Sequence, residues 1–239
     1  MANISFVQRD FSAMRDAKAL GRELPPADVT VLTHGIVPGS KREETADGLE
    51  QDMAVSCLSR LVILRELLPR LPADARVFVY GMPGNGANNF RFDDLNAEKG
   101  YEGSFGFVHI NTVGGNEALV LHLAAAQRAK VAAEAKVALF GVNPGLLPTD
   151  IRNAVHGGRA SFSGACMETL LSWFTPSLEK YAATMVPLFF APGLEAHSGA
   201  MFGQKGTAIK INPEFEPPGR ASEWYNALEA LLKAKVPDL

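Results

Sequence analysis

Cysteine and surplus positive charge are both scarce in this chain of 239 residues. Only Cys57 and Cys166 occur, in apolar surroundings and without metal-ligand spacing. This excludes a disulfide framework and fits buried thiols in a reducing compartment. The 23 Lys and Arg residues do not outnumber the 26 Asp and Glu residues, and the net charge is -3. Because a surface without a basic surplus neutralises few phosphates, we expect no nucleic acid partner.

Long apolar runs and several site motifs are missing as well. No segment reaches the length that spans a bilayer, and the start lacks the basic and apolar regions of a signal peptide. We therefore expect a cytoplasmic protein without a membrane partner. His122, His156 and His197 show no metal-ligand spacing, and no Gly-x-Ser-x-Gly elbow is present, so neither a metal site nor a serine hydrolase is expected. The partner that remains is a small-molecule ligand.

Apolar residues make up 47% of the chain, enough for one well-buried core, and we expect a single domain over residues 1–239. Buried strands are predicted at Val29–Leu32, Val77–Tyr80 and Lys136–Gly141. Apolar residues at helical spacing predict helices over 11–24, 47–70 and 111–130. Strands that alternate with such helices form βαβ units, so the fold class is α/β, with a mostly parallel sheet and helices on both faces.

The remaining elements are shorter. They are a β-rich run at 4–7, apolar helical segments around 170–174 and 185–190, a last strand at 207–211 and a closing helix at 221–233. The helix over 47–70 carries a start signal, because Asp47 is placed to accept from its first free amides and Glu50 to reach back.

In a parallel sheet of this kind the ligand crevice lies beyond the carboxyl ends of the strands. This places His34 and the loop that contains Met82 beside the crevice, and both are candidates for substrate binding. For His34 the alternative is a surface histidine. The run Gly81-Met-Pro-Gly-Asn-Gly86 offers backbone amides to an anion, but Pro83 removes one donor, and we interpret the run as an ordinary loop.

Five stretches follow one another in an order and spacing typical of one enzyme family. They are Phe6-Val-Gln-Arg-Asp10-Phe-Ser, Leu32-Thr-His-Gly35, Thr45-Ala-Asp-Gly-Leu-Glu-Gln-Asp-Met-Ala-Val-Ser56, Phe92-Asp-Asp-Leu-Asn-Ala-Glu-Lys-Gly-Tyr101 and Val142-Asn-Pro-Gly-Leu-Leu-Pro-Thr149. Together they resemble the short-chain dehydrogenase/reductase family, most closely its retinol-dehydrogenase-like branch and fungal relatives. The likeness covers most of the chain.

The resemblance implies a Rossmann-like fold and a set of cofactor contacts. By position, Asp10 would contact adenine, Gly35 is the glycine that survives from an Asn-Asn-Ala-Gly stretch, and the Pro144-Gly145 turn with Thr149 would hold the nicotinamide end. Trp173 lies in the segment that covers an apolar substrate in relatives. For Asp10 we prefer a second interpretation, a cap on the helix that follows.

The departures from the family concern its first βαβ portion, which has no counterpart here. That portion of the family contains the glycine-rich turn that binds the pyrophosphate at a helix N-terminus. We therefore expect no cofactor, with NAD(P) binding as the alternative. The same departure leaves the run Ile4–Gln8 without its usual neighbours. It either pairs directly beside Val29–Leu32, which we favour, or stays at an exposed edge that invites association with another chain.

The catalytic residues of the family are also replaced. The family uses a Tyr whose pKa is lowered by a neighbouring Lys. Alignment by resemblance puts His109 at the Tyr position, Val113 at the Lys position and Ser56 at the position of the family's Asn. Since imidazole titrates near neutrality, His109 is the remaining acid–base candidate, and Ser56 and Asn111 complete the predicted catalytic set.

Two functions follow from these observations. The first is a protein that binds a small, largely apolar molecule without hydride transfer, either as a non-redox enzyme that uses His109 or as a binding module. The second is an NAD(P)-dependent oxidoreductase that acts on a carbonyl or alcohol. The resemblance also implies a homodimer, since relatives pair through the surfaces that correspond to helices 47–70 and 111–130.

Overall fold

The computed structural model describes residues 4–84, 86–103, 106–130, 136–148 and 175–239. Within these ranges one sheet has the strand order β1-β2-β3-β4-β5. Its strands are β1 (Val29–Leu32), β2 (Arg76–Tyr80), β3 (Ala138–Val142), β4 (Met201–Phe202) and β5 (Ala208–Ile209). The first four run parallel, and β5 runs antiparallel to β4. The predicted α/β class with a mostly parallel sheet is confirmed.

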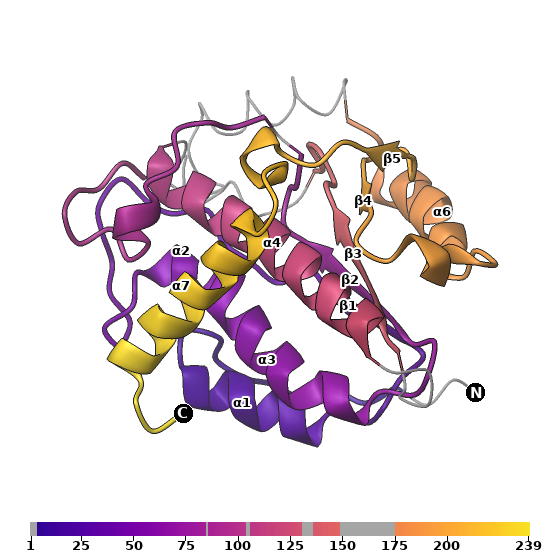
Figure 1. Cartoon of the computed structure of the whole chain (residues 1–239), viewed down its shortest axis with the longest axis horizontal. Coiled ribbons are helices and arrows are strands. Elements are labelled where there is room, and N and C mark those ends of the chain that lie inside the picture. Colours follow the sequence, from indigo (N-terminus) through magenta and orange to yellow (C-terminus); the bar gives the residue numbers. More distant parts are fainter. Residues whose placement is uncertain (1–3, 85, 104–105, 131–135, 149–174) are drawn as a thin grey trace.

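Helices lie on both faces of the sheet, as predicted (Figure 1). The helices α1 (Met14–Glu23), α3 (Ser59–Leu67), α4 (Phe107–Ala129) and α7 (Arg220–Lys235) share one core, and α6 (Leu178–Phe189) packs on the other face. Strand β2 shows how one apolar run serves both cores. Val77 and Val79 point into the first core and Phe78 into the second, because successive side chains of a strand alternate between faces.

The predicted helix over 47–70 is continuous but changes its winding. It passes through α2 (Gln51–Met53), a π-helical turn η1 (Ala54–Leu58) and α3, and it ends in the 3-10 turn η2 (Leu68–Arg70). Single π-helical turns are rare in proteins, and those that occur are often found at functional sites. This one contains Ser56.

The cap of this helix differs from the prediction. Glu50 is the N-cap, and its carboxylate accepts from the amide of Met53 at 2.7 Å. Asp47 instead accepts from the amide of Met14 at 2.8 Å and so caps α1. The reason is tertiary packing, since α1 lies against α3 and brings its own unsatisfied first amides to Asp47.

The boundaries of other elements also differ from the predicted ones. Helix α4 begins at Phe107, before the predicted start at 111, which places His109 in its first turn. The predicted strand 207–211 shortens to β5, and β4 has no counterpart in the prediction because two residues carry no periodic signal. The segment around 170–174 lies outside the described residues. The other 3-10 turns are η3 (Phe92–Asp94), η5 (Leu194–His197) and η6 (Pro213–Phe215).

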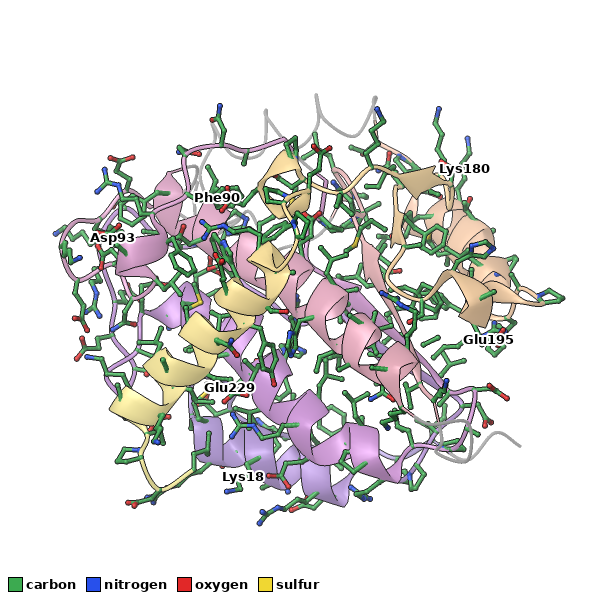
Figure 2. The ribbon with its side chains drawn as sticks, viewed as in Figure 1. Lys18, Phe90, Asp93, Lys180, Glu195 and Glu229 are labelled. Atoms are coloured by element: carbon green, nitrogen blue, oxygen red, sulfur yellow. The ribbon has the colours of Figure 1, made fainter. Side chains whose placement is uncertain are left out.

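The long loop after β2 returns across the helical layer. Phe90, labelled in Figure 2, belongs to this loop. Its ring packs edge-on against that of Trp224 of α7, with 5.2 Å between the ring centroids. Trp224 is buried, and its indole N–H donates to Glu214 at 3.1 Å. The loop is therefore anchored to the last helix of the chain. No helix in the described ranges is long and apolar enough to cross a membrane.

The favoured pairing of Ile4–Gln8 with β1 is wrong. In the part of the chain that the structure describes, this segment forms no strand and no backbone hydrogen bond to the sheet, and β1 pairs with β2 alone. The residues that follow are held beside α1 and the end of β1. The Phe11 ring lies 4.3 Å from the ring of His34, and Arg9 forms an ion pair with Glu23 of α1. Within the described ranges β1 therefore has a strand partner on one side only.

Candidate active site

Three polar side chains meet where the π-helical turn faces the first turn of α4. His109 Nδ1 lies 2.9 Å from Asp52 Oδ2, and Ser56 Oγ donates to Asp52 Oδ1 at 2.6 Å. Asp52, Ser56 and His109 are named the acid–base cluster here. Asp52 stands between the other two and uses both of its carboxylate oxygens.

The acid–base cluster lies beyond the carboxyl end of β1. The amide of Ile36 donates to Ser56 Oγ at 2.9 Å, and a Cβ atom on Gly35 would lie 3.3 Å from the same oxygen. Since β1 ends at Leu32, both residues belong to the loop that follows this strand. This is the end of a parallel sheet at which such folds bind ligands.

The electrostatics of the cluster favour a protonated histidine. The side chain of Asp52 is 0% exposed and that of His109 is 21% exposed. Burial disfavours the imidazolium, but the hydrogen bond and charge of Asp52 together with the charge of Glu50 outweigh it, so the pKa of His109 is raised. With Nδ1 directed at Asp52, Nε2 accepts no hydrogen bond and donates none within the described residues. Nε2 is therefore the atom that can exchange a proton with a ligand.

A second buried carboxyl stands next to the cluster. Burial raises the pKa of Glu50 to about 7, and the neighbouring charge of Asp52 adds to this effect. The Glu50 amide donates to Asn96 Oδ1 at 2.7 Å, and Asn96 in turn donates to the carbonyl of Gly48 at 3.0 Å. The start of α2 is thus held against the loop Phe92–Tyr101, one of the stretches that resemble the family.

A buried arginine supports the cluster from α3. Arg60 donates from Nη1 to Asn116 Oδ1 at 2.8 Å and from Nη2 to the carbonyl of His34. Asn116 donates to the carbonyls of Ser56 at 2.8 Å and Thr112 at 2.9 Å. Burial lowers the pKa of Arg60 to about 10, which still leaves the guanidinium charged at neutral pH. The end of β1, the π-helical turn and α4 are held together by this one cation.

Two predicted site residues use their polar groups in contacts within the chain. His34 Nε2 lies 3.0 Å from Ser59 Oγ, and burial together with the Arg60 cation lowers the pKa of His34 to about 3. Asn111 accepts from the amide of Arg91 and donates to its carbonyl, both at 3.0 Å. His34 is thus a neutral, packed histidine, and Asn111 fixes the loop that precedes α4. Their predicted contacts with a ligand remain predictions.

The predicted cofactor residues are spread over the molecule. Asp10 is exposed and accepts from the amide of Ser12 at 2.9 Å, and hydrogen bonding to Ser12 lowers its pKa. Because Ser12 precedes α1 and Asp47 accepts from the first amide of that helix, the preferred interpretation of Asp10 as its cap is wrong. Gly35 lies at the cluster, as described above. Pro144 begins the turn after β3, and Gly145 takes a left-handed conformation with φ of 62°. Thr149 and Trp173 lie outside the described residues.

The loops after β2 and β3 are tied to each other. Asn143 donates to the carbonyl of Pro83 at 3.0 Å and accepts from the amide of Gly145 at 3.0 Å. Met82 between β2 and Pro83 has a φ of 52°, a conformation that residues with bulky side chains rarely adopt. A strained, partly exposed residue of this kind is typical of a functional site. The structure thus places Met82 on the predicted edge of the sheet.

The Gly81–Gly86 run does not offer the amide of Gly84 to an anion. That amide donates to Glu117 Oε2 at 2.9 Å, and Glu117 Oε1 accepts from the amide of Asn212 at 2.6 Å. Glu117 is buried on α4, and burial raises its pKa. A carboxylate in this place repels an anion and favours the ordinary-loop interpretation.

Three residues of the site region escaped the sequence analysis: Asp52, Arg60 and Glu117. Asp52 and Ser56 are four positions apart on one helix, a spacing at which side chains meet, so this signal was present. Arg60 falls within an apolar stripe, where a charge is unusual unless it serves the backbone. Glu117 gives no local signal, because its partners lie 33 and 95 residues away.

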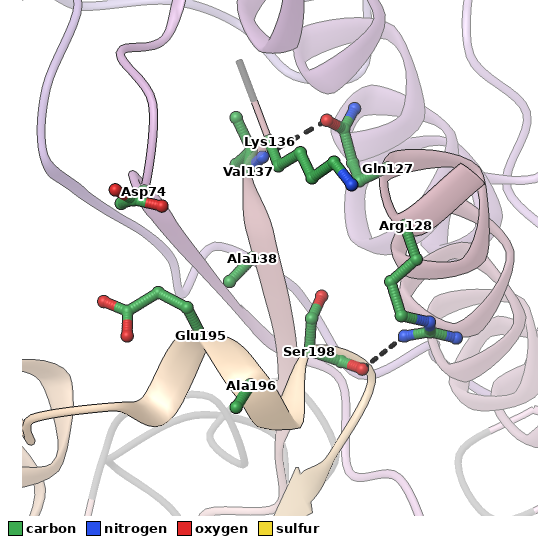
Figure 3. Close-up of a pocket in the computed structure, with 9 residues that line it drawn as sticks. All are labelled: Asp74, Gln127, Arg128, Lys136, Val137, Ala138, Glu195, Ala196 and Ser198. Atoms are coloured by element: carbon green, nitrogen blue, oxygen red, sulfur yellow. Dashed lines mark hydrogen bonds between the residues drawn. The ribbon is translucent and has the colours of Figure 1, made fainter. Parts of the chain in front are cut away.

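A pocket is found at the opposite end of the strands. A pocket of about 280 Å³ opens at the amino ends of β2 and β3 (Figure 3). Its lining is Asp74, Gln127, Arg128, Lys136, Val137, Ala138, Glu195, Ala196 and Ser198. Gln127 accepts from the amide of Val137 at 3.2 Å, and Arg128 donates to the carbonyl of Ser198. The described residues contain no group of His, Cys, Asp or Glu that could hold a metal ion.

The parallel sheet, its two helical layers and the site beyond the strand ends define a Rossmann-like α/β protein. No family model matches the sequence. The chain is 37% identical over 221 residues to an uncharacterized oxidoreductase of Saccharomyces cerevisiae, a match that covers 88% of this chain and 68% of the yeast protein. It is 26% identical over 204 residues to retinol dehydrogenase 14 of Mus musculus, with 81% and 57% covered. The chain belongs to the short-chain dehydrogenase/reductase family.

Solved structures agree with this fold. A short-chain dehydrogenase/reductase from Serratia marcescens superposes with a TM-score of 0.57 at 16% identity and covers 84% of this chain and 74% of its own. The angucycline C-6 ketoreductase LanV with bound NADP gives the same TM-score and identity, with 84% and 73% covered. At this level of identity the two structures support the architecture alone.

Proposed function

We propose that the protein is an NAD(P)-dependent oxidoreductase that acts on a carbonyl or alcohol, with His109 as its proton donor and acceptor. The observation that carries the proposal is the contact of 2.9 Å between His109 Nδ1 and the buried Asp52. The similarity to an oxidoreductase of yeast and to a mouse retinol dehydrogenase supports redox chemistry over the non-redox alternative. NADP bound to the structurally similar LanV supports the choice of cofactor.

The described residues fit one end of such a cofactor. The left-handed turn at Gly145, tied through Asn143 to the loop of Met82, forms a small backbone surface at the edge where β2 and β3 end. A nicotinamide ring would be held there. In the described ranges no glycine-rich turn from a strand into a helix is available for the diphosphate, because the amide of Gly84 is taken by Glu117.

The chain's own residues supply the proton. With NAD(P)H bound, the cofactor would provide the hydride for the carbonyl carbon. His109, protonated at Nε2 because its pKa is raised, donates this proton to the carbonyl oxygen, and the product is an alcohol. Asp52 holds Nδ1–H and stabilises the imidazolium, while Ser56 fixes the carboxylate. In the reverse direction neutral Nε2 accepts the proton of the alcohol.

The pH dependence of this scheme has a definite sign. Carbonyl reduction needs protonated His109, so its rate falls as the pH rises through the raised pKa, and alcohol oxidation changes in the opposite direction. Asp52→Asn removes the charge that raises the pKa, and the reduction profile moves to lower pH. The measurement is kcat/KM against pH with NADPH and a panel of apolar aldehydes and ketones.

Two further variants test the role of the histidine. His109→Ala lowers kcat/KM by about 10²- to 10⁴-fold. His122→Ala is the matched control, because His122 lies on the same helix but bonds Ser222 at 3.0 Å, away from the cluster. If the wild type neither binds NADPH in a fluorescence titration nor oxidises it with any carbonyl, the oxidoreductase proposal is overturned.

A further inference from the structure

A buried carboxylate in the middle of α4 takes no part in the proposed proton transfer. Glu117 is 1% exposed, and each of its oxygens accepts one backbone amide, Oε2 from Gly84 at 2.9 Å and Oε1 from Asn212 at 2.6 Å. Carboxylates are rarely buried to this extent, because the loss of hydration is costly unless hydrogen bonds replace it. Packing alone would be served better by an apolar side chain, so the role of Glu117 lies in the amides that it holds.

One of these amides belongs to the peptide group between Pro83 and Gly84. The carbonyl of the same peptide group, that of Pro83, accepts from Nδ2 of Asn143 at 3.0 Å. A trans peptide group is planar, and its N–H and C=O point in opposite directions. By holding the N–H, Glu117 therefore fixes the direction in which the carbonyl meets the side chain of Asn143.

Glycine makes this restraint necessary. Gly84 has a φ of 67°, and a Cβ atom on it would collide with the carbonyl oxygen of Lys210. Since a glycine rotates more freely about its backbone bonds than any other residue, the chain itself does not set the orientation of the peptide group that precedes it. The carboxylate of Glu117 supplies that orientation from α4.

Asn143 carries the orientation to the turn after β3. Its own amide donates to the carbonyl of Phe202 at 2.8 Å, so its backbone is held and the side chain is the part that the Pro83 carbonyl directs. Oδ1 of Asn143 accepts from the amide of Gly145 at 3.0 Å. An Asn side chain that bonds the amide two residues later forms an Asx turn, which fixes the backbone in between.

We propose that Glu117 is a positioning residue that holds the Gly145 turn in place through the Pro83–Gly84 peptide group and the side chain of Asn143. These three hydrogen bonds, from Glu117 to Gly145, are named the Glu117 path. The inference rests on the proposed function in one respect, since this turn is where the nicotinamide end of the cofactor would be held. Glu117 then contributes to cofactor affinity through Asn143 and not by contact with the cofactor.

The first test is the hydrogen exchange rate of the Gly145 amide, measured by NMR on the intact chain without cofactor. Glu117→Met keeps most of the volume and removes both acceptors. Exchange at Gly84 and at Gly145 is expected to become at least about tenfold faster, the effect of losing one hydrogen bond to a charged group. Urea unfolding checks that the variant is folded.

Glu117→Gln is the milder variant and keeps the test decisive if Glu117→Met does not fold. Its amide group offers one acceptor in place of two, so one of the two backbone amides loses its partner. The exchange rates show which one. Gly145 is expected to follow Gly84 and not Asn212, and a Gly145 amide that departs from Gly84 in this variant contradicts the proposal.

The second test is a double-mutant cycle on the Kd for NADPH, measured by nicotinamide fluorescence. Glu117→Met and Asn143→Ala should each raise this Kd about tenfold, roughly the loss of one such hydrogen bond. Because both changes interrupt the same path, the double variant should bind no more weakly than the weaker of the two single variants. Losses that add in full would mean that Glu117 does not act through Asn143.

Asp94→Leu is the matched control. Asp94 is also a buried carboxylate that accepts two backbone amides, those of Glu98 at 2.8 Å and Lys99 at 2.9 Å, but in the loop before α4. It should lower the stability of the fold and leave exchange at Gly145 unchanged.

An unchanged Gly145 amide in Glu117→Met overturns the proposal, and so does an equal acceleration in Asp94→Leu, which would indicate a general loosening of the fold. A wild type that binds no NADPH would overturn the proposed function alone, since the exchange rates test the Glu117 path without the cofactor.

Discussion

The two ends of the parallel strands hold charge in different ways. At the carboxyl end, Asp52, Arg60 and Glu117 are buried, and each bonds a backbone group or a polar side chain across several elements. At the amino end, Lys136 and Glu195 line an open pocket of about 280 Å³. The charged side chains of this pocket are thus less buried than those at the carboxyl end. Buried, hydrogen-bonded charge indicates the functional end better than the presence of a pocket does.

The comparison is tested most strongly at Arg60. Arg60→Ala should lower the free energy of unfolding by about 3–5 kcal/mol, since it opens a cavity and leaves the His34 carbonyl and Asn116 Oδ1 without their donor. Arg60→Met keeps most of the volume and should lose less, so the difference separates packing from hydrogen bonding. Urea unfolding of both variants gives the two values. Equal losses would mean that the packing of the Arg60 side chain contributes little and that its hydrogen bonds account for the loss in both variants.

Glu50 sharpens the comparison through pH. Its pKa is raised from 4.5 to about 7, so the folded state prefers the protonated carboxyl. The raised pKa of Glu50 therefore adds at most about 3 kcal/mol to the free energy of unfolding. This contribution is fully present below about pH 4.5 and is lost as the pH rises to about 7. Glu50→Gln should flatten the dependence of the unfolding free energy over this window. Glu216→Gln, at an exposed carboxyl, should leave it unchanged, and an unchanged profile in Glu50→Gln would contradict the prediction.

The smallest effect is expected at the amino end. Lys136→Ala should change the free energy of unfolding by less than about 0.5 kcal/mol, because the side chain is exposed. It should also leave kcat/KM for carbonyl reduction at the wild-type value. A loss of activity comparable to that of His109→Ala would reverse the comparison and move the chemistry to the pocket.

Much of the fold could be predicted from periodicity. The alternation of apolar runs with helical stripes gave β1, β2, β3, α3, α4 and α7, because these elements bury long, regular faces. The caps could not be assigned in this way. Asp47 and Glu50 are both suitable capping residues, and the packing of α1 decides between them. Pairing of Ile4–Gln8 with β1 failed for a related reason, since sequence gives strand propensity but not the position of a crossover helix.

The candidate site could be predicted in part. His109 and Ser56 were identified from resemblance, and the structure brings both to Asp52. Their catalytic roles remain predictions. Asp52 itself was missed although its helical spacing to Ser56 was visible in the sequence. Its contact with His109 spans 57 residues and depends on how two helices cross, which no local pattern encodes.

The Glu117 carboxylate has a consequence for the order of folding. It bonds an amide 33 positions before it and another 95 positions after it, at a site that water does not reach. A partly formed chain that has buried α4 but not yet closed both long loops holds a bare carboxyl in an apolar surrounding, which is unfavourable. The loop after β2 and the segment around Asn212 are therefore expected to dock late and together, as one cooperative unit rather than one after the other.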